Sequence, residues 1–104
     1  MNPLLVKIEG EQRFSRLLPG KPVTAGIKSG YMVLKPGESV GEHKTEAKEE
    51  AIIVLEGECQ VFCGGKLEFI ARKNNLVYIP PETNHDIKNS GDKILKYVYL
   101  AAPV

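Results

Sequence analysis

Short apolar runs and turn residues alternate along most of the chain. The runs are rich in β-branched and aromatic residues and cover positions 31–34, 51–56, 59–63, 67–71, 76–79 and 94–100. Turn-forming pairs such as Pro36-Gly37 and Pro80-Pro81 stand among them. Many short strands with closely spaced turns are typical of a β-sandwich or a β-barrel. The pattern therefore predicts an all-β fold.

A glycine pair divides one of the apolar stretches. Gly64 and Gly65 separate the runs 59–63 and 67–71. Glycine accepts the positive φ that a type I′ turn requires, so we expect a β-hairpin here. Near the N-terminus, residues 4–8 are also predicted to form a strand, which would be an additional strand of the fold.

One segment carries the signals of both helix and strand. Residues 42–55 contain many Glu, Lys and Ala, which favour helices, and they end shortly before Gly57. A helix would place His43, Ala47 and Glu50 on one face. Two strands would need a charged turn near residues 46–49. The β character of the surrounding sequence favours the strands, and we predict those.

Length and charge limit the classes of partner. The 104 residues suit one domain, which we expect to cover 1–104. With 14 basic and 13 acidic residues, no strong basic field would attract nucleic acid or an anionic membrane. The longest apolar run, 51–55, is far shorter than the ~20 residues that span a bilayer. Residues 1–11 lack the pattern of a secretory signal, so a cytoplasmic location is expected.

The two cysteines support a reducing compartment. Cys59 and Cys63 lie in one predicted strand, where their Cα atoms would be ~13 Å apart. A disulfide needs about 5.5 Å between Cα atoms. We therefore expect free thiols that pack as small apolar residues. A second, weaker hypothesis is that Cys59, Val61 and Cys63 line the barrel and place a thiol near the site described next.

The candidate chemistry rests on the only two histidines, His43 and His85. Imidazole is the commonest metal ligand, and two imidazoles with a carboxylate suit a first-row divalent metal. Glu50 is seven positions after His43, so only a turn between them can direct both into one interior. Glu50 is preferred to Glu49 because it alternates with the apolar positions 52 and 54. On a later strand, His85 shares its face with residues 87 and 89.

At these positions the sequence resembles the cupin superfamily. The first cupin motif has a Gly, five residues, His-x-His, three or four residues, a Glu, six residues and a Gly. Its places are held here by Gly37, His43, Thr45, Glu50 and Gly57. The second motif has a Gly, five residues, Pro-x-Gly, two residues, a His, three residues and an Asn. Its places are held by Asn74, Pro80, Glu82, His85 and Asn89.

The resemblance implies a double-stranded β-helix, that is, a jelly-roll barrel. It assigns His43, Glu50 and His85 as ligands of a divalent transition metal, with Zn, Mn, Fe or Ni as candidates. Thr45 replaces the second histidine of the first motif and either offers its hydroxyl or leaves that place to water. Asn74 tolerates the left-handed conformation of the glycine it replaces, whereas Glu82 suggests an altered turn.

The resemblance also implies a small-molecule ligand or substrate and a homodimer that pairs through terminal strands. Three functions stay open. The protein is a metal-dependent enzyme of the oxygenase or isomerase type, a non-catalytic module that binds a small molecule, or a regulatory cupin without metal. No catalytic residue is assigned. Tyr31, Tyr78, Phe62 and Phe69 are expected to serve packing rather than substrate contact.

Overall fold

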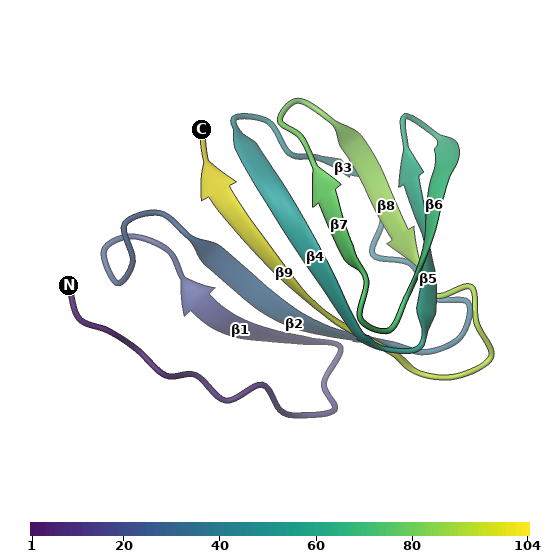
Figure 1. Cartoon of the computed structure of the whole chain (residues 1–104), viewed down its shortest axis with the longest axis horizontal. Helices are drawn as coiled ribbons and strands as arrows, with labels where there is room; N and C mark the ends of the chain where they lie inside the picture. The colour runs from purple at the N-terminus through teal and green to yellow at the C-terminus, as the bar shows by residue number, and fades with distance from the viewer.

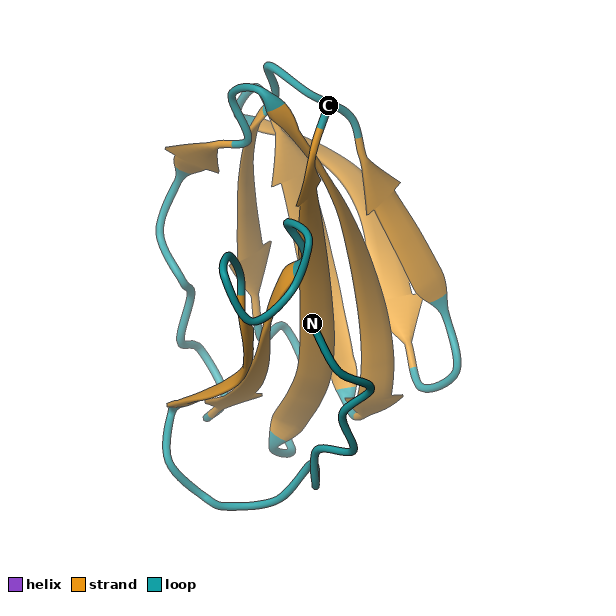
Figure 2. Cartoon of the chain, turned by 90° about the vertical axis from the view of Figure 1, so that its left-hand side faces the viewer, coloured by secondary structure: helices purple, strands orange, loops and turns teal.

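The computed structural model describes residues 1–104 as nine strands in two antiparallel sheets that face each other (Figures 1 and 2). The larger sheet has the order β1-β2-β9-β4-β7 and the smaller one the order β3-β8-β5-β6. No helix could span a membrane. The strands are β1 (Phe14–Pro19), β2 (Lys28–Leu34), β3 (His43–Lys44), β4 (Lys48–Glu56), β5 (Glu58–Cys63), β6 (Lys66–Arg72), β7 (Leu76–Ile79), β8 (Asn84–Lys88) and β9 (Leu95–Pro103).

The core forms because alternate side chains of both sheets point inward. In β4, Ile52 and Val54 are buried while Ile53 and Leu55 are partly exposed on the outer face. The inward residues of the two sheets form one cluster that includes Leu34, Ile52, Val54, Cys59, Val61, Ile79, Ile87 and Leu95. This packing fills one end of the barrel with apolar side chains and leaves the polar inward positions to the other end.

The predicted all-β fold is confirmed: five of the six apolar runs lie within a strand, and the sixth, 94–100, begins one residue before β9. Residues 42–55 form strands β3 and β4, and the chain turns at Glu46, which has φ +57°. Gly64 and Gly65 have φ +59° and +79°, and their turn joins β5 to β6 as a hairpin. Both cysteines are free, as expected from their shared strand.

The prediction of a strand at residues 4–8 is wrong. This segment is extended, but it pairs with no strand and stays exposed, with Leu5 95% accessible (Figure 1). The edge of the sheet beside β2 is taken by β1 instead, whose register runs from Phe14 opposite Met32 to Pro19 opposite Lys28. An alternating pattern shows that a segment can form a strand, but it does not show that an edge is free to receive it.

Candidate metal centre

A cavity of about 370 Å³ opens between the two sheets at the end of the barrel that carries the C-terminus. Short strand β3, the beginnings of β4 and β8, and the last part of β9 lie at this end (Figure 1). The inward positions near these strand ends are polar or small, so apolar packing does not fill the space. The cavity wall contains His43, Thr45, Glu50 and His85.

The three predicted metal ligands lie close together in the structure. His43 and His85 are direct partners across β3 and β8, and the centroids of their rings are 4.1 Å apart. Glu50 faces them from β4 in the opposite sheet, because the turn at Glu46 reverses the side to which the chain points. One ligand atom from each residue lies within 4.8 Å of the other two. Glu49 points the other way, and its carboxylate accepts a hydrogen bond from the Tyr78 hydroxyl.

The carboxylate of Glu50 and the imidazole of His85 meet in a buried environment. Nε2 of His85 lies 2.7 Å from Oε2 of Glu50, and their side chains are 1% and 10% exposed. The contact lacks the direction of a good hydrogen bond, and neither atom has any other partner. Buried polar atoms are normally satisfied, so this pair is an exception that calls for an explanation. Two ligand atoms that converge on a common point have this geometry.

The other nitrogen of each ring faces a backbone carbonyl. Nδ1 of His85 lies 3.3 Å from the Thr83 carbonyl, and Nδ1 of His43 lies 3.1 Å from the Gly41 carbonyl. A proton donated from Nδ1 leaves Nε2 with its lone pair free, which is the tautomer that binds a metal. Burial is the largest single influence and lowers the pKa of His85, but the contact with Glu50, its negative charge, the Thr83 carbonyl and the charge of Asp86 together raise it by more. The net pKa of His85 therefore lies above its ordinary value.

Thr45 has a structural function that the sequence pattern did not reveal. It is buried, and its hydroxyl donates to the Pro80 carbonyl at 2.7 Å and accepts from the Thr83 amide at 3.0 Å. These bonds tie the loop after β3 to the turn before β8, and so hold His85 in place. Of the two possibilities left by the sequence, a hydroxyl ligand or an open place, the bonding favours the open place.

Replacement of Thr45 by valine, which keeps the shape of the side chain, is expected to lower stability. Both backbone partners lose a hydrogen bond in a part-buried place, which reduces the free energy of unfolding by about 1–3 kcal/mol. Urea denaturation in the presence of a chelator measures this loss. Thr83→Val is the comparison, because that hydroxyl donates only one local bond, to Pro81. A larger loss in Thr83→Val than in Thr45→Val would contradict the prediction.

The remaining motif residues shape turns rather than the site. Asn89 is buried, and its amide donates to the carbonyls of Leu34 and Lys93 and accepts from the Gly91 amide. Asn74 has φ +72°, as predicted for a residue in place of glycine. Glu82 has a positive φ of +55°, a backbone conformation that glycine adopts more readily than glutamate. Its carboxylate pairs with Lys44 at 3.1 Å on the surface.

Neither cysteine belongs to the ligand group. Cys59 lies in the apolar core, and burial raises the pKa of its thiol to about 11. Cys63 is the direct partner of His85 across β5 and β8, but it lies outside the cluster of His43, Glu50 and His85. The structure therefore places one thiol, that of Cys63, on the strand beside His85, as this hypothesis expected, but not among the candidate ligands.

Comparisons with known proteins agree with this architecture. The family model of the cupin domain matches residues 30–101. Polyketide synthase CurC of Streptomyces cyaneus is 34% identical over 86 residues, which make up 80% of this chain and 55% of CurC. The chain thus spans about half the length of that curated relative.

Two solved structures show the same fold. An RmlC-like cupin family protein of Methanocaldococcus jannaschii, described as a double-stranded β-helix, aligns with a TM-score of 0.81 and 20% identity over 99% of this chain and 93% of its own. A protein described as a predicted oxalate decarboxylase of Thermotoga maritima aligns with a TM-score of 0.72 and 20% identity over 97% and 100%. At these identities the likeness concerns the fold, and it confirms the predicted double-stranded β-helix.

Proposed function

Because this chain belongs to the cupin domain family, we propose that it holds a divalent transition metal and binds or converts a small molecule beside it. His43, Glu50 and His85 are the proposed ligands. The observation that carries the proposal is the convergence of their ligand atoms within 4.8 Å, with Glu50 Oε2 and His85 Nε2 lacking other partners. Zn, Mn, Fe and Ni all suit two imidazoles and one carboxylate.

The residues present fit such a metal in number and kind. Three protein ligands with a further place open to water or substrate are typical of reactive metal sites rather than purely structural ones. A metal bound there would polarise an oxygen of the substrate as a Lewis acid. The protein's own part is to orient the two imidazoles through Thr83 and Gly41 and to exclude bulk water from His85, which is 1% exposed.

The names of related proteins allow more than one reaction class. One fold relative is described as a predicted oxalate decarboxylase, and one curated relative as a polyketide synthase. We propose that an enzymatic reaction at this site would be of the oxygenase type or of the isomerase type, on a small molecule. Catalysis without a metal has little support, because the cavity contains no nucleophile paired with a base of its own. Both histidines, which could act as bases, belong to the ligand group.

A metal-free binding module is the second candidate, and one observation favours it. Thr45 stands where a further ligand is expected, and its hydroxyl is already bonded to backbone atoms. In this case the contact between Glu50 and His85 acts as a buried ion pair that closes the barrel.

Three further proposals concern the whole chain. We propose that residues 1–104 form a single domain, that the protein is a homodimer and that it is located in the cytoplasm. The two free thiols support the cytoplasmic location.

Elemental analysis at two pH values tests the proposal. Protein purified without chelator at pH 8 is expected to carry about one transition-metal ion per chain. Because the pKa of His85 is raised, protons compete for Nε2 at a higher pH than at an ordinary imidazole. Dialysis to pH 5.5 should therefore release the metal. Protein that contains no metal at pH 8 and takes up none from a buffered zinc or manganese solution would exclude this function and leave the binding module.

A further inference from the structure

Cationic side chains gather in the wall of the cavity. Arg16, Lys28, Lys44 and Lys48 line it, and Glu50 is the only acidic residue there. The chain as a whole is nearly balanced, with 14 basic and 13 acidic residues. The cavity therefore has an excess of positive charge that the overall composition does not predict.

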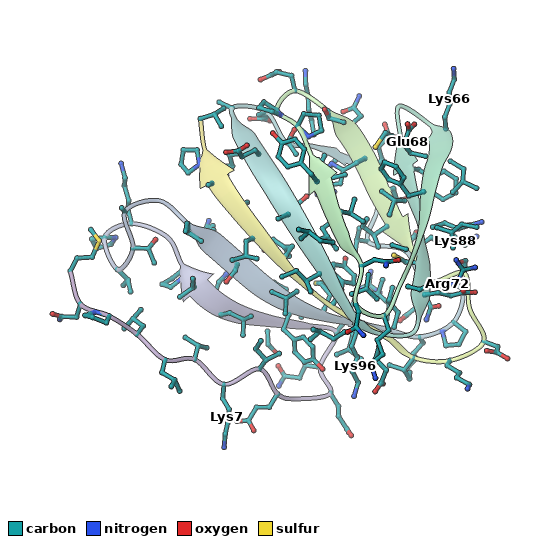
Figure 3. All side chains as sticks on the ribbon, viewed as in Figure 1. Lys7, Lys66, Glu68, Arg72, Lys88 and Lys96 are labelled. Carbon is teal, nitrogen blue, oxygen red and sulfur yellow. The ribbon has the colours of Figure 1, made fainter.

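Three of these four cations have no acidic partner. Lys44 pairs with Glu82, but Arg16, Lys28 and Lys48 take part in none of the ion pairs of the structure. Many other charged side chains extend from the barrel into solvent, as Figure 3 shows for Lys66 and Lys88. The unpaired cations of the cavity are thus free to meet an anion that enters it.

The sheet register places two of the lysines beside the candidate ligands. Lys28 in β2, Ala101 in β9 and Glu50 in β4 form one row across the inner face of the larger sheet. The small side chain of Ala101 leaves space between Lys28 and Glu50. Lys48 lies two residues before Glu50 and shares its face. An anion near the ligand group would therefore be within the field of both ammonium groups.

Arg16 is held in position without using its whole guanidinium group. Its Nη1 donates to the Tyr99 hydroxyl at 2.9 Å and to the Ser29 carbonyl at 3.3 Å, and the group lies 4.8 Å from the centre of the Phe14 ring. Nε and Nη2 form no hydrogen bond. Guanidinium nitrogens of this kind bind a carboxylate through two parallel hydrogen bonds.

Gly30 makes this arrangement possible. It lies between Arg16 of β1 and Tyr99 of β9 in the same row of the sheet. A Cβ atom at this position would be 2.5 Å from the Phe14 ring and 2.7 Å from the Tyr99 ring. The absence of a side chain therefore lets both rings cover the sheet and support the guanidinium group.

Apolar groups form the rest of the wall. They include Met32, Val40, Ile52, Ile87 and Tyr97. The cavity, at about 370 Å³, is within the size range of small-molecule sites. A ligand that matches this wall has an apolar body and a negative group at one end.

We propose that the cavity binds a small organic carboxylate, with its apolar body inside the barrel and its carboxylate between Arg16, Lys28 and Lys48. This names the ligand class of the proposed function and rests on it, since the same cavity contains the candidate metal ligands. It adds the three cations as binding residues outside the ligand group.

Titration with benzoate and with its neutral counterpart benzamide tests the charge preference. We expect benzoate to bind at least about tenfold more tightly, because one charge-assisted contact contributes on the order of 1.5 kcal/mol or more. The preference should fall as salt is raised from low to about 0.5 M, because salt screens charges at a partly open site. Chemical shifts of the backbone amides of β2 and β9 in NMR spectra follow the binding.

Variants identify the residues responsible. Arg16→Gln and Lys28→Gln should each weaken benzoate binding about fivefold or more and leave benzamide binding unchanged. Lys66→Gln, at the solvent-exposed hairpin, is the matched control and should behave like the original protein. Lys28 makes no side-chain hydrogen bond or ion pair, so its variant is expected to fold even if Arg16→Gln does not.

The outcome is separable from that of the metal proposal. All titrations are run on chelator-treated protein and on protein loaded with zinc, with metal content measured on the same samples. A charge preference that persists without metal supports the anion site even if the metal proposal fails. Equal binding of benzoate and benzamide, or unchanged benzoate binding in both variants, would overturn the anion site whatever the metal content.

Discussion

Replacement of His85 by alanine is expected to lower the affinity of the protein for a divalent transition metal by at least about 100-fold, since even residues that only support a ligand contribute 10–100-fold. His85 is the most buried of the three candidate ligands, and its Nε2 has no partner other than Glu50. Its loss leaves one imidazole and one carboxylate. Competition with a chromophoric chelator measures the affinity.

A pair of neighbouring glutamates gives a matched control for this prediction. Glu50→Gln keeps the shape of the side chain but replaces a charged ligand by a weaker neutral one, and it should also lower metal affinity strongly. Glu49→Gln changes the same residue type one position away, on the outer face, where the carboxylate contacts only the Tyr78 hydroxyl. It should leave metal affinity unchanged.

The control also separates ligand loss from a general loss of structure. His85→Ala also leaves the buried Glu50 carboxylate without its partner, which reduces stability by about 1–3 kcal/mol, so urea denaturation is measured alongside. Glu50→Gln leaves no space. Metal affinity that stays unchanged in both His85→Ala and Glu50→Gln, or that falls equally in Glu49→Gln, would refute the assignment of these ligands.

Local patterns were sufficient to predict most strands. The glycine pair 64–65 indicates a hairpin because a two-residue turn with two positive φ angles requires such residues, and both angles are positive in the structure. Glu50 was distinguished from Glu49 by alternation with Ile52 and Val54, and these two are buried beside it. Each inference used residues close together in sequence, whose relation depends only on strand geometry.

Long-range pairing explains what the sequence did not reveal. The segment 4–8 alternates like a strand, yet β1 occupies the sheet edge beside β2, and nothing within the segment indicates that competition. Thr45 is nearly forty residues from Thr83, the backbone partner of its hydroxyl. The cationic side chains of the cavity could not be predicted from the sequence for the same reason. Arg16 and Lys28 line the same cavity as the ligand group only because of the register of β1, β2, β9 and β4.

The largest expected loss of stability comes from a glycine of the first motif. Gly57 has φ +82°, and a Cβ atom there would lie 2.5 Å from the Ile94 carbonyl oxygen and 3.1 Å from the Leu95 Cα. Both neighbours are backbone atoms, one in the first residue of β9 and one in the residue before it, and Leu95 is fully buried. Gly57→Ala therefore forces the backbone of β9 away from β4, in addition to the strain of its own φ.

Gly37 is the matched control for this substitution. It also belongs to the first motif and has φ +86°, but no atom lies within 4 Å of the place where its Cβ would be. Gly37→Ala should therefore reduce the free energy of unfolding only by about 1 kcal/mol, from backbone strain alone. For Gly57→Ala we expect about 2–4 kcal/mol, because displacement of packed backbone costs about 1–3 kcal/mol in addition to the same strain. Urea denaturation of both variants with chelator present measures the difference. Equal losses would mean that the two glycines serve only their turns, and that the contact with β9 adapts without strain.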